Sequence, residues 1–223
     1  MQQYRVTLTG LSPLLMHQDN LAYMEKIESW RRDPNNQSGE KSKKGDDRNP
    51  AWIWIGYLYH NGKIIGIPAD NLMTMLREGG TKVLTGGKKN ETFKKYTQSG
   101  IVIDQQQWDI TVNGETISMH EIKSLIGTDD FSAHIETAEQ LGFELLVKRA
   151  KIGTSKHVRV RPLFREWTAS GSLTVLDPER SGITRGVIGT ILDQAGSLCG
   201  LCDWRPSSPR SGGSFGKFSA VIE

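Results

Sequence analysis

The fold can be inferred by working outward from the stretch Gly196-Ser-Leu-Cys-Gly-Leu-Cys-Asp-Trp-Arg-Pro-Ser-Ser-Pro-Arg-Ser-Gly-Gly-Ser-Phe-Gly-Lys-Phe218. It is rich in glycine and serine, and no acidic residue follows Asp203 within it. Its basic and aromatic side chains are Trp204, Arg205, Arg210, Phe215 and Lys217. Glycines allow close backbone approach, arginines supply positive charge and aromatic rings stack on bases. The stretch is therefore typical of a loop that binds a phosphate backbone with unpaired bases.

Regular elements are predicted on both sides of this loop. Apolar residues recur at helical spacing from Ile183 to Leu198, which predicts an amphipathic helix before it. The run Phe218–Ile222 predicts a short strand after it. At the other end of the chain, Tyr4–Gly10 alternates apolar and polar residues, as a half-buried strand does.

The middle of the chain combines strands with one clear helix. Asn61-Gly62 and Asn113-Gly114 are hairpin turn signals, and Gly171 is read as a further turn. The segment Pro68–Gly79 starts with proline and ends with glycine, which predicts a helix. The predicted strands are Ile53–Tyr59, Lys63–Ile67, Ile101–Asp104, Trp108–Val112, Phe143–Val147, His157–Arg161, Phe164–Ala169 and Ser172–Leu176.

Two polar insertions interrupt these elements. The first spans residues 18–52 and is predicted to hold a short helix at Leu21–Trp30, followed by a long flexible segment. A solvated loop and an arm that contacts a partner are both open interpretations of that segment. The second insertion spans residues 79–100 and is lysine-rich. Its Gly86-Gly87-Lys88-Lys89 lacks the spacing of a phosphate-binding P-loop.

Composition sets limits on the class of protein. The chain has 223 residues, of which 36% are hydrophobic and 24% are charged, and its net charge is +3. These values favour one folded domain, residues 1–223, with polar insertions over a compact enzyme, and leave nucleic-acid binding to be argued from clustering. With no secretory leader pattern and no long apolar run, we expect a cytoplasmic protein with no membrane partner.

The two cysteines, Cys199 and Cys202, form a C-x-x-C pair. A redox pair would precede a helix, whereas this pair follows one. A structural zinc site needs two more ligands, and the histidines are scattered singly. We therefore favour small residues at a helix end, and predict no metal and no cofactor.

A basic run marks the second half of the chain. Its members are Lys148, Arg149, Lys151, Lys156, Arg159, Arg161 and Arg165, with no acidic residue among them. Because His157–Arg161 alternates, Arg159 and Arg161 share one face of the predicted strand. Nucleic-acid binding is the favoured interpretation, and an edge strand protected from aggregation by its charges is the alternative.

Without the insertions, the order of elements is β-α-β-β-α-β, which predicts an α+β ferredoxin-like or RRM-like fold. Two helices, Ala69–Glu78 and Ile183–Ser197, are expected to cover one face of a single antiparallel sheet. The strands expected in that sheet are Tyr4–Gly10, the Ile101 region, the Phe143–Val160 region and Phe215–Ile222.

Three stretches carry a family resemblance: Thr9–His17, Ile67–Arg77 and Gly200–Gly216. In their order and placement they resemble the RAMP superfamily of CRISPR-associated proteins, especially its backbone subunit, which coats the guide RNA. They are also similar to phage proteins of similar length. The loop departs from the family pattern in its two cysteines and its long serine-rich second half.

The resemblance implies binding of single-stranded RNA by a row of identical subunits in a ribonucleoprotein of antiviral defence. The insertion after the first strand would then act as a thumb on the neighbouring copy. Other subunits of a CRISPR-like complex, and a DNA target strand, are further implied partners. The nucleic-acid-binding residues expected from sequence and resemblance together are Ser12, His17, Asn71, Thr74, Arg77, Lys148, Arg149, Lys151, Lys156, Arg159, Arg161, Arg165, Trp204, Arg205, Arg210 and Lys217.

Two other functions stay open. Some members of the resembled family cut RNA, and by position the candidates for such chemistry here are Asp19 and His17. No pair of acid and base groups is evident in the sequence, so no catalytic residue is predicted. A phage protein that binds single-stranded DNA in recombination, or has a structural role, is the third hypothesis.

Overall fold

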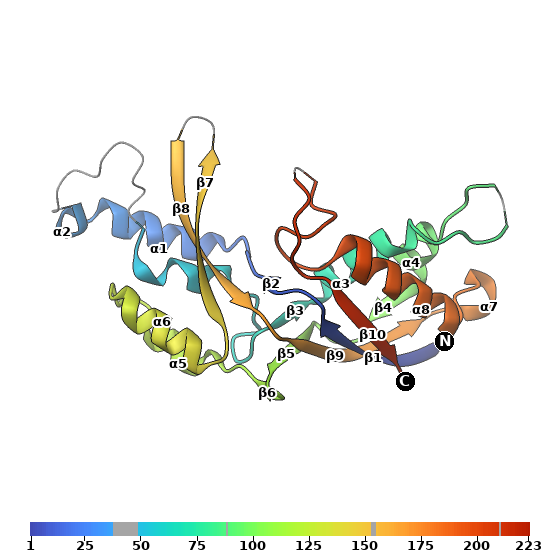
Figure 1. Cartoon of the computed structure of the whole chain (residues 1–223). Helices are drawn as coiled ribbons and strands as arrows, with labels where there is room; N and C mark the ends of the chain where they lie inside the picture. The colour runs from blue at the N-terminus through green and yellow to red at the C-terminus, as the bar shows by residue number, and fades with distance from the viewer. Residues whose placement is uncertain (38–48, 88, 153–154, 210) are drawn as a thin grey trace.

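The computed structural model describes residues 1–37, 49–87, 89–152, 155–209 and 211–223. In these residues the chain forms two antiparallel sheets and several helices, which confirms the predicted α+β class (Figure 1). The seven-stranded sheet runs through β10 (Phe218–Ile222), β1 (Gln2–Gly10), β9 (Thr168–Val175), β5 (Gln107–Val112) and β3 (Gly66–Pro68), with β4 (Ile101–Ile103) on β9 and β6 (Glu115–Thr116) on β5.

Helices α3 (Ala69–Gly80) and α8 (Arg185–Gln194) pack against each other on one face of this sheet (Figure 1). Their close approach depends on Gly79, because a Cβ there would lie 2.6 Å from the Ile191 carbonyl oxygen. The elements β1, α3, β4, β9, α8 and β10 follow one another along the chain, and their strands lie in the order β10-β1-β9-β4. This arrangement is compatible with the ferredoxin-like plan.

The predicted alternation of β1 is confirmed. Tyr4, Val6 and Leu8 are buried, and the residues between them are exposed or half-buried. The strand lies between β9 and β10, so its apolar face contributes to the core beneath the helices. Burial of one face is what makes a period of two visible in sequence.

The segment Phe143–Val160 was expected in the large sheet, and this expectation is wrong. Instead β7 (Glu144–Ile152) and β8 (Ser155–Phe164) form a long hairpin, which joins β2 (Leu14–Leu15) in a separate three-stranded sheet (Figure 1). The place beside β1 is taken by β9, one continuous strand. Gly171 lies within it, paired with Val6 of β1, and makes no turn. Glycine is required there because a Cβ would be 2.1 Å from Trp108 Nε1.

The predicted strand Ile53–Tyr59 is also wrong, since Ala51–Tyr57 forms the 3₁₀ helix η1. Trp52 through Ile55 are all buried, so the run shows no polar face from which a period could be read. The turn at Asn61-Gly62 is confirmed by a bridge between His60 and Ile65.

The described parts of both insertions are folded. Helix α1 (Leu21–Arg32) confirms the predicted helix. Its apolar residues Leu21, Met24 and Ile27 suggested one buried face, but the buried residues are Tyr23 and Ile27, and Leu21 and Met24 are exposed. Residues 38–48, the centre of the first insertion, lie outside the described residues. Helix α4 (Lys94–Gly100) of the second insertion packs against α3. The remaining helices are α2 (Pro34–Gln37), α5 (Met119–Ser124), α6 (Phe131–Gln140), α7 (Pro178–Ser181) and the π-helix η2 (Ala195–Cys199).

Candidate nucleic-acid interface

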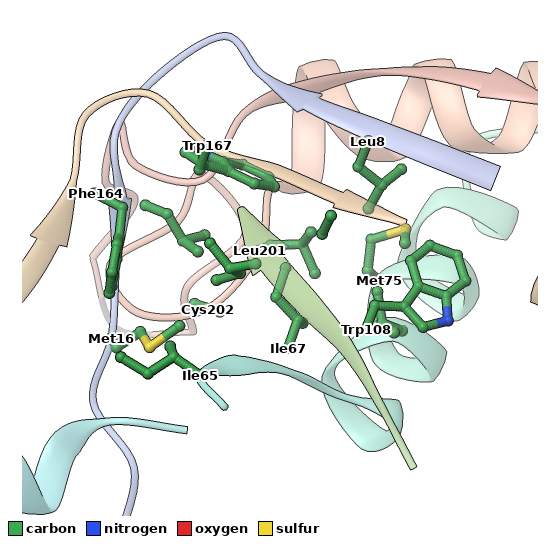
Figure 2. Packing of buried hydrophobic residues seen from close by; sticks show 14 of the residues in the cluster. Leu8, Met16, Ile65, Ile67, Met75, Trp108, Phe164, Trp167, Leu201 and Cys202 are labelled. Carbon is green, nitrogen blue, oxygen red and sulfur yellow. The ribbon is translucent and has the colours of Figure 1, made fainter. Parts of the chain in front are cut away.

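The glycine-rich loop, residues 200–209 and 211–217, is fastened to the segment that follows β1. The backbone N–H of Asp203 donates to the Leu15 carbonyl oxygen at 2.9 Å, and that of Gly216 donates to Pro13 at 2.8 Å. Leu201 and Cys202 are buried in the core, where Figure 2 shows them with Ile67 and Met16. The loop is therefore anchored by backbone hydrogen bonds and by apolar burial.

Two glycines allow the loop to cross over itself. Gly216 has a φ of 71°, and a Cβ there would lie 2.1 Å from the Leu201 carbonyl oxygen. A Cβ on Gly213 would lie 1.6 Å from the Trp204 carbonyl oxygen. At these two positions glycine allows the loop to approach its own backbone, whereas the sequence was interpreted as close approach to a phosphate backbone.

A pocket of about 210 Å³ lies between this loop, α3 and the segment after β2. Asn71 and Thr74 project into it from one face of α3, as residues three apart on a helix do. Four sequence-predicted residues thus meet in one place, together with groups that the sequence did not single out. The lining residues are His17, Tyr59, Asn71, Thr74, Gly200, Leu201, Cys202, Asp203 and Arg205.

Asp203 is the charged centre of the pocket wall. Its Oδ2 accepts a hydrogen bond from Arg161 Nη1 at 2.6 Å and lies 3.5 Å from His17 Nδ1. Burial alone would raise the pKa of this carboxyl, but the bond from His17, the Arg161 charge and the Trp204 backbone N–H outweigh burial and hold the pKa below its ordinary value. Asp203 is therefore ionised at neutral pH. The His17 ring also packs against the Tyr57 ring, with 4.4 Å between the ring centroids.

Arg205 is bound inside the loop. Its Nη2 donates to Glu78 Oε1 of α3 at 3.1 Å, its Nη1 to the Cys202 carbonyl oxygen at 3.2 Å, and its Nε to Ser207 Oγ at 3.0 Å. Ser207 in turn donates to Glu78 Oε2 at 2.5 Å. These contacts fasten the loop to α3. Glu78 could have been found in the sequence, because it lies on the helix face of Asn71 and Thr74.

The cysteines behave as small buried residues at a helix end, as expected. Cys199 is the last residue of η2, and both thiols are free. Burial raises the pKa of Cys202 to about 12 and also raises that of Cys199, so both are neutral thiols. Among the described residues, no group of three or more His, Cys, Asp or Glu side chains could hold a metal ion.

The hairpin presents two neighbouring cations, one of which contacts the loop. Lys148 of β7 lies directly opposite Arg159 of β8, on the same face of the sheet. The Lys148 ammonium lies over the Trp204 ring, 4.0 Å from its centroid. The ring centroids of Trp204 and Phe215 are 5.8 Å apart. Like charges directly opposite in an antiparallel pair repel each other. A negatively charged ligand would relieve that repulsion.

The structure divides the predicted basic residues into two groups. Within the described residues, Arg161, Arg165 and Arg205 form ion pairs with acidic side chains. Four others have no acidic partner among those residues: Arg77, Lys148, Arg159 and Lys217. Among the predicted basic residues whose side chains the structure describes, the second group alone has its full charge available for phosphates.

The other predicted residues are placed as follows. Ser12 accepts the Lys217 N–H at its Oγ and the Trp167 Nε1–H at its carbonyl oxygen, so it holds the loop. The backbones of Arg149, Lys151 and Lys156 lie in β7 and β8, while their side chains and all of Arg210 lie outside the described residues. Tyr57, Tyr59, Glu78, Asp203 and Ser207 belong to the site but were not among the residues predicted from sequence.

No protein-family model matches the chain, and no curated protein shows significant sequence similarity to it. In the part of the chain that the structure describes, no helix has the length and apolar character needed to cross a membrane.

Proposed function

We propose that this protein is a non-catalytic, cytoplasmic subunit that binds single-stranded RNA and coats it as a row of copies within a ribonucleoprotein. The observation that carries the proposal is Lys148, which lies over the Trp204 ring and has Arg159 directly opposite it in the hairpin. Neither cation has an acidic partner among the described residues. Cations next to an aromatic platform are what single-stranded nucleic acids require, since phosphates take the charge and bases stack on the ring. The thumb role of residues 18–52 belongs to the same proposal.

The double variant Lys148→Ala with Arg159→Ala tests this function. We expect weaker binding to every single-stranded sequence, because phosphate contacts are lost. The magnitude of the slope of log K against log salt should fall by about 1.4, which is roughly 0.7 for each lost contact on a single strand. Filter binding or fluorescence anisotropy at several salt concentrations measures both quantities.

The matched control is Lys94→Ala with Lys95→Ala. These two exposed lysines lie on α4, which packs against α3, and their removal changes the net charge by the same amount. We expect the control to retain the wild-type salt slope. If both double variants lower the slope equally, binding follows net charge, and the hairpin has no special role.

An endoribonuclease is the second candidate function, and the His17–Asp203 pair is the observation that favours it. A carboxylate beside one imidazole nitrogen is the arrangement that orients a general base. The other suggested residue, Asp19, is exposed, and among the described residues it belongs to no group of three or more His, Cys, Asp or Glu side chains that could hold a metal ion.

Incubation of RNA with purified protein distinguishes the two functions. We expect wild type, His17→Ala and Asp19→Ala to leave the RNA intact, both with EDTA and with magnesium. Gel electrophoresis of end-labelled RNA measures the outcome. Fragments produced in EDTA by wild type, and absent with His17→Ala, would replace the binding proposal with metal-independent cleavage. Fragments that need magnesium and Asp19 would indicate a metal-dependent nuclease.

A further inference from the structure

The pocket beside the hairpin contains a negative group at a surface proposed to bind a polyanion. The Asp203 side chain is 29% exposed and lines the pocket, and its carboxyl is ionised at neutral pH. An ionised carboxylate repels phosphates and only accepts hydrogen bonds. A nucleic acid can therefore present only its hydrogen-bond donors to this group.

The charges around the pocket cancel in pairs. Arg161 is paired with Asp203, and Arg205 is paired with Glu78. The remaining polar lining includes His17, which lies beside Asp203, together with the Thr74 hydroxyl and the Asn71 amide. A pocket whose arginine is already paired with a carboxylate, and whose wall carries a second carboxylate, a hydroxyl and an amide, suits a hydroxyl-bearing ligand better than a phosphate. Its volume of about 210 Å³ gives room for one sugar ring.

Single-stranded RNA carries two kinds of donor, the N–H groups of its bases and the ribose 2′-hydroxyl. Base donors change with sequence, whereas the 2′-hydroxyl is present at every nucleotide and absent from DNA. A subunit that coats RNA of any sequence needs a contact that does not depend on the base. We propose that the pocket recognises a ribose 2′-hydroxyl through the Asp203 carboxylate and thereby selects RNA over DNA, an inference that rests on the proposed RNA-binding function.

The experiment compares three oligonucleotides of one sequence: RNA, DNA and 2′-fluoro RNA. The fluoro form keeps an RNA-like sugar conformation but cannot donate a hydrogen bond. We expect wild type to bind RNA about tenfold more tightly than either of the others, the effect of one hydrogen bond to a charged group. Asp203→Ala should bind all three with nearly equal affinity. Because the measured quantity is a ratio, general weakening of the loop does not imitate the result.

Two variants complete the test. Thr74→Val removes a hydroxyl from the wall of the same pocket and leaves the hydrogen bonds of the loop in place. We expect this variant to reduce the preference for RNA over DNA, and it serves as the test if Asp203→Ala fails to fold. Glu144→Gln removes a carboxylate that pairs with Arg165 outside the pocket, and it should keep the wild-type ratio.

The failures can be told apart. Equal wild-type affinity for RNA and 2′-fluoro RNA overturns 2′-hydroxyl recognition and leaves the proposed function standing. A preference that survives in folded Asp203→Ala overturns the assignment to this pocket. Absence of binding to all three oligonucleotides overturns the proposed function itself.

Discussion

Gly216→Ala is expected to lower the melting temperature by about 6–12 °C and to abolish RNA binding. The new methyl group would lie 2.1 Å from the Leu201 carbonyl oxygen, in a backbone conformation with a φ of 71° that disfavours a side chain. Strain and collision together cost about 3 kcal/mol, and each kcal/mol shifts the melting temperature by about 2–4 °C at this chain length. Thermal unfolding followed by circular dichroism measures the shift.

Gly182→Ala separates the two causes. Its φ of 67° is close to that of Gly216, but no atom lies within 4 Å of the new Cβ. Only the backbone strain remains, so we expect a loss of about 1 kcal/mol and unchanged RNA binding. If Gly216→Ala and Gly182→Ala lose the same free energy of unfolding, the Gly216 segment is free to move away from Leu201. That result would contradict the anchored loop described above.

Arg205→Ala is expected to destabilise the protein by about 2 kcal/mol while leaving the salt slope of RNA binding unchanged. The guanidinium bonds Glu78, the Cys202 carbonyl oxygen and Ser207, and the side chains of the Arg205–Glu78 pair are only 21% and 26% exposed. Removing one partner of such a pair leaves the other charge poorly solvated. Sequence alone suggested a phosphate contact instead, and that prediction requires the slope to fall.

Arg165→Ala is the matched control for this change. Arg165 forms a bidentate pair with Glu144, but its side chain is 63% exposed. Water screens an exposed ion pair, so such a pair contributes little to stability and little change in melting temperature is expected. A lower salt slope in Arg205→Ala at an unchanged melting temperature would show that Arg205 contacts phosphate and that its pair with Glu78 opens on binding.

Sequence patterns correctly predicted the elements that have one face buried in the core and the other exposed to solvent. Strand β1 and helix α3 alternate or repeat because one side meets the core, and their positions were predicted correctly. Where both sides are buried, as in η1, the apolar run shows no period and was taken for a strand. Gly171 was read as a turn because its role depends on Trp108, a partner in another strand.

The site was predictable only where it is continuous in sequence. The glycine-rich loop and the pair Asn71 and Thr74 were identified from local residues. The partners of the arginines were not, because Arg205 and Glu78 are 127 residues apart and no local pattern links them. Isolated arginines look the same in a sequence whether they are neutralised by a distant acid or left with free charge.

The attachment of the loop to the segment after β1 has a consequence for the order of folding. The Lys217 N–H donates to Ser12 Oγ across 205 residues of sequence. Contacts between such distant residues carry a high loop-closure entropy and form slowly. During synthesis, β1 and the residues after it therefore lack their hydrogen bonds to the loop until Lys217 has been added and has left the ribosome. We expect nascent chains that end before the loop to lack affinity for RNA, so that binding begins only after translation has passed this point.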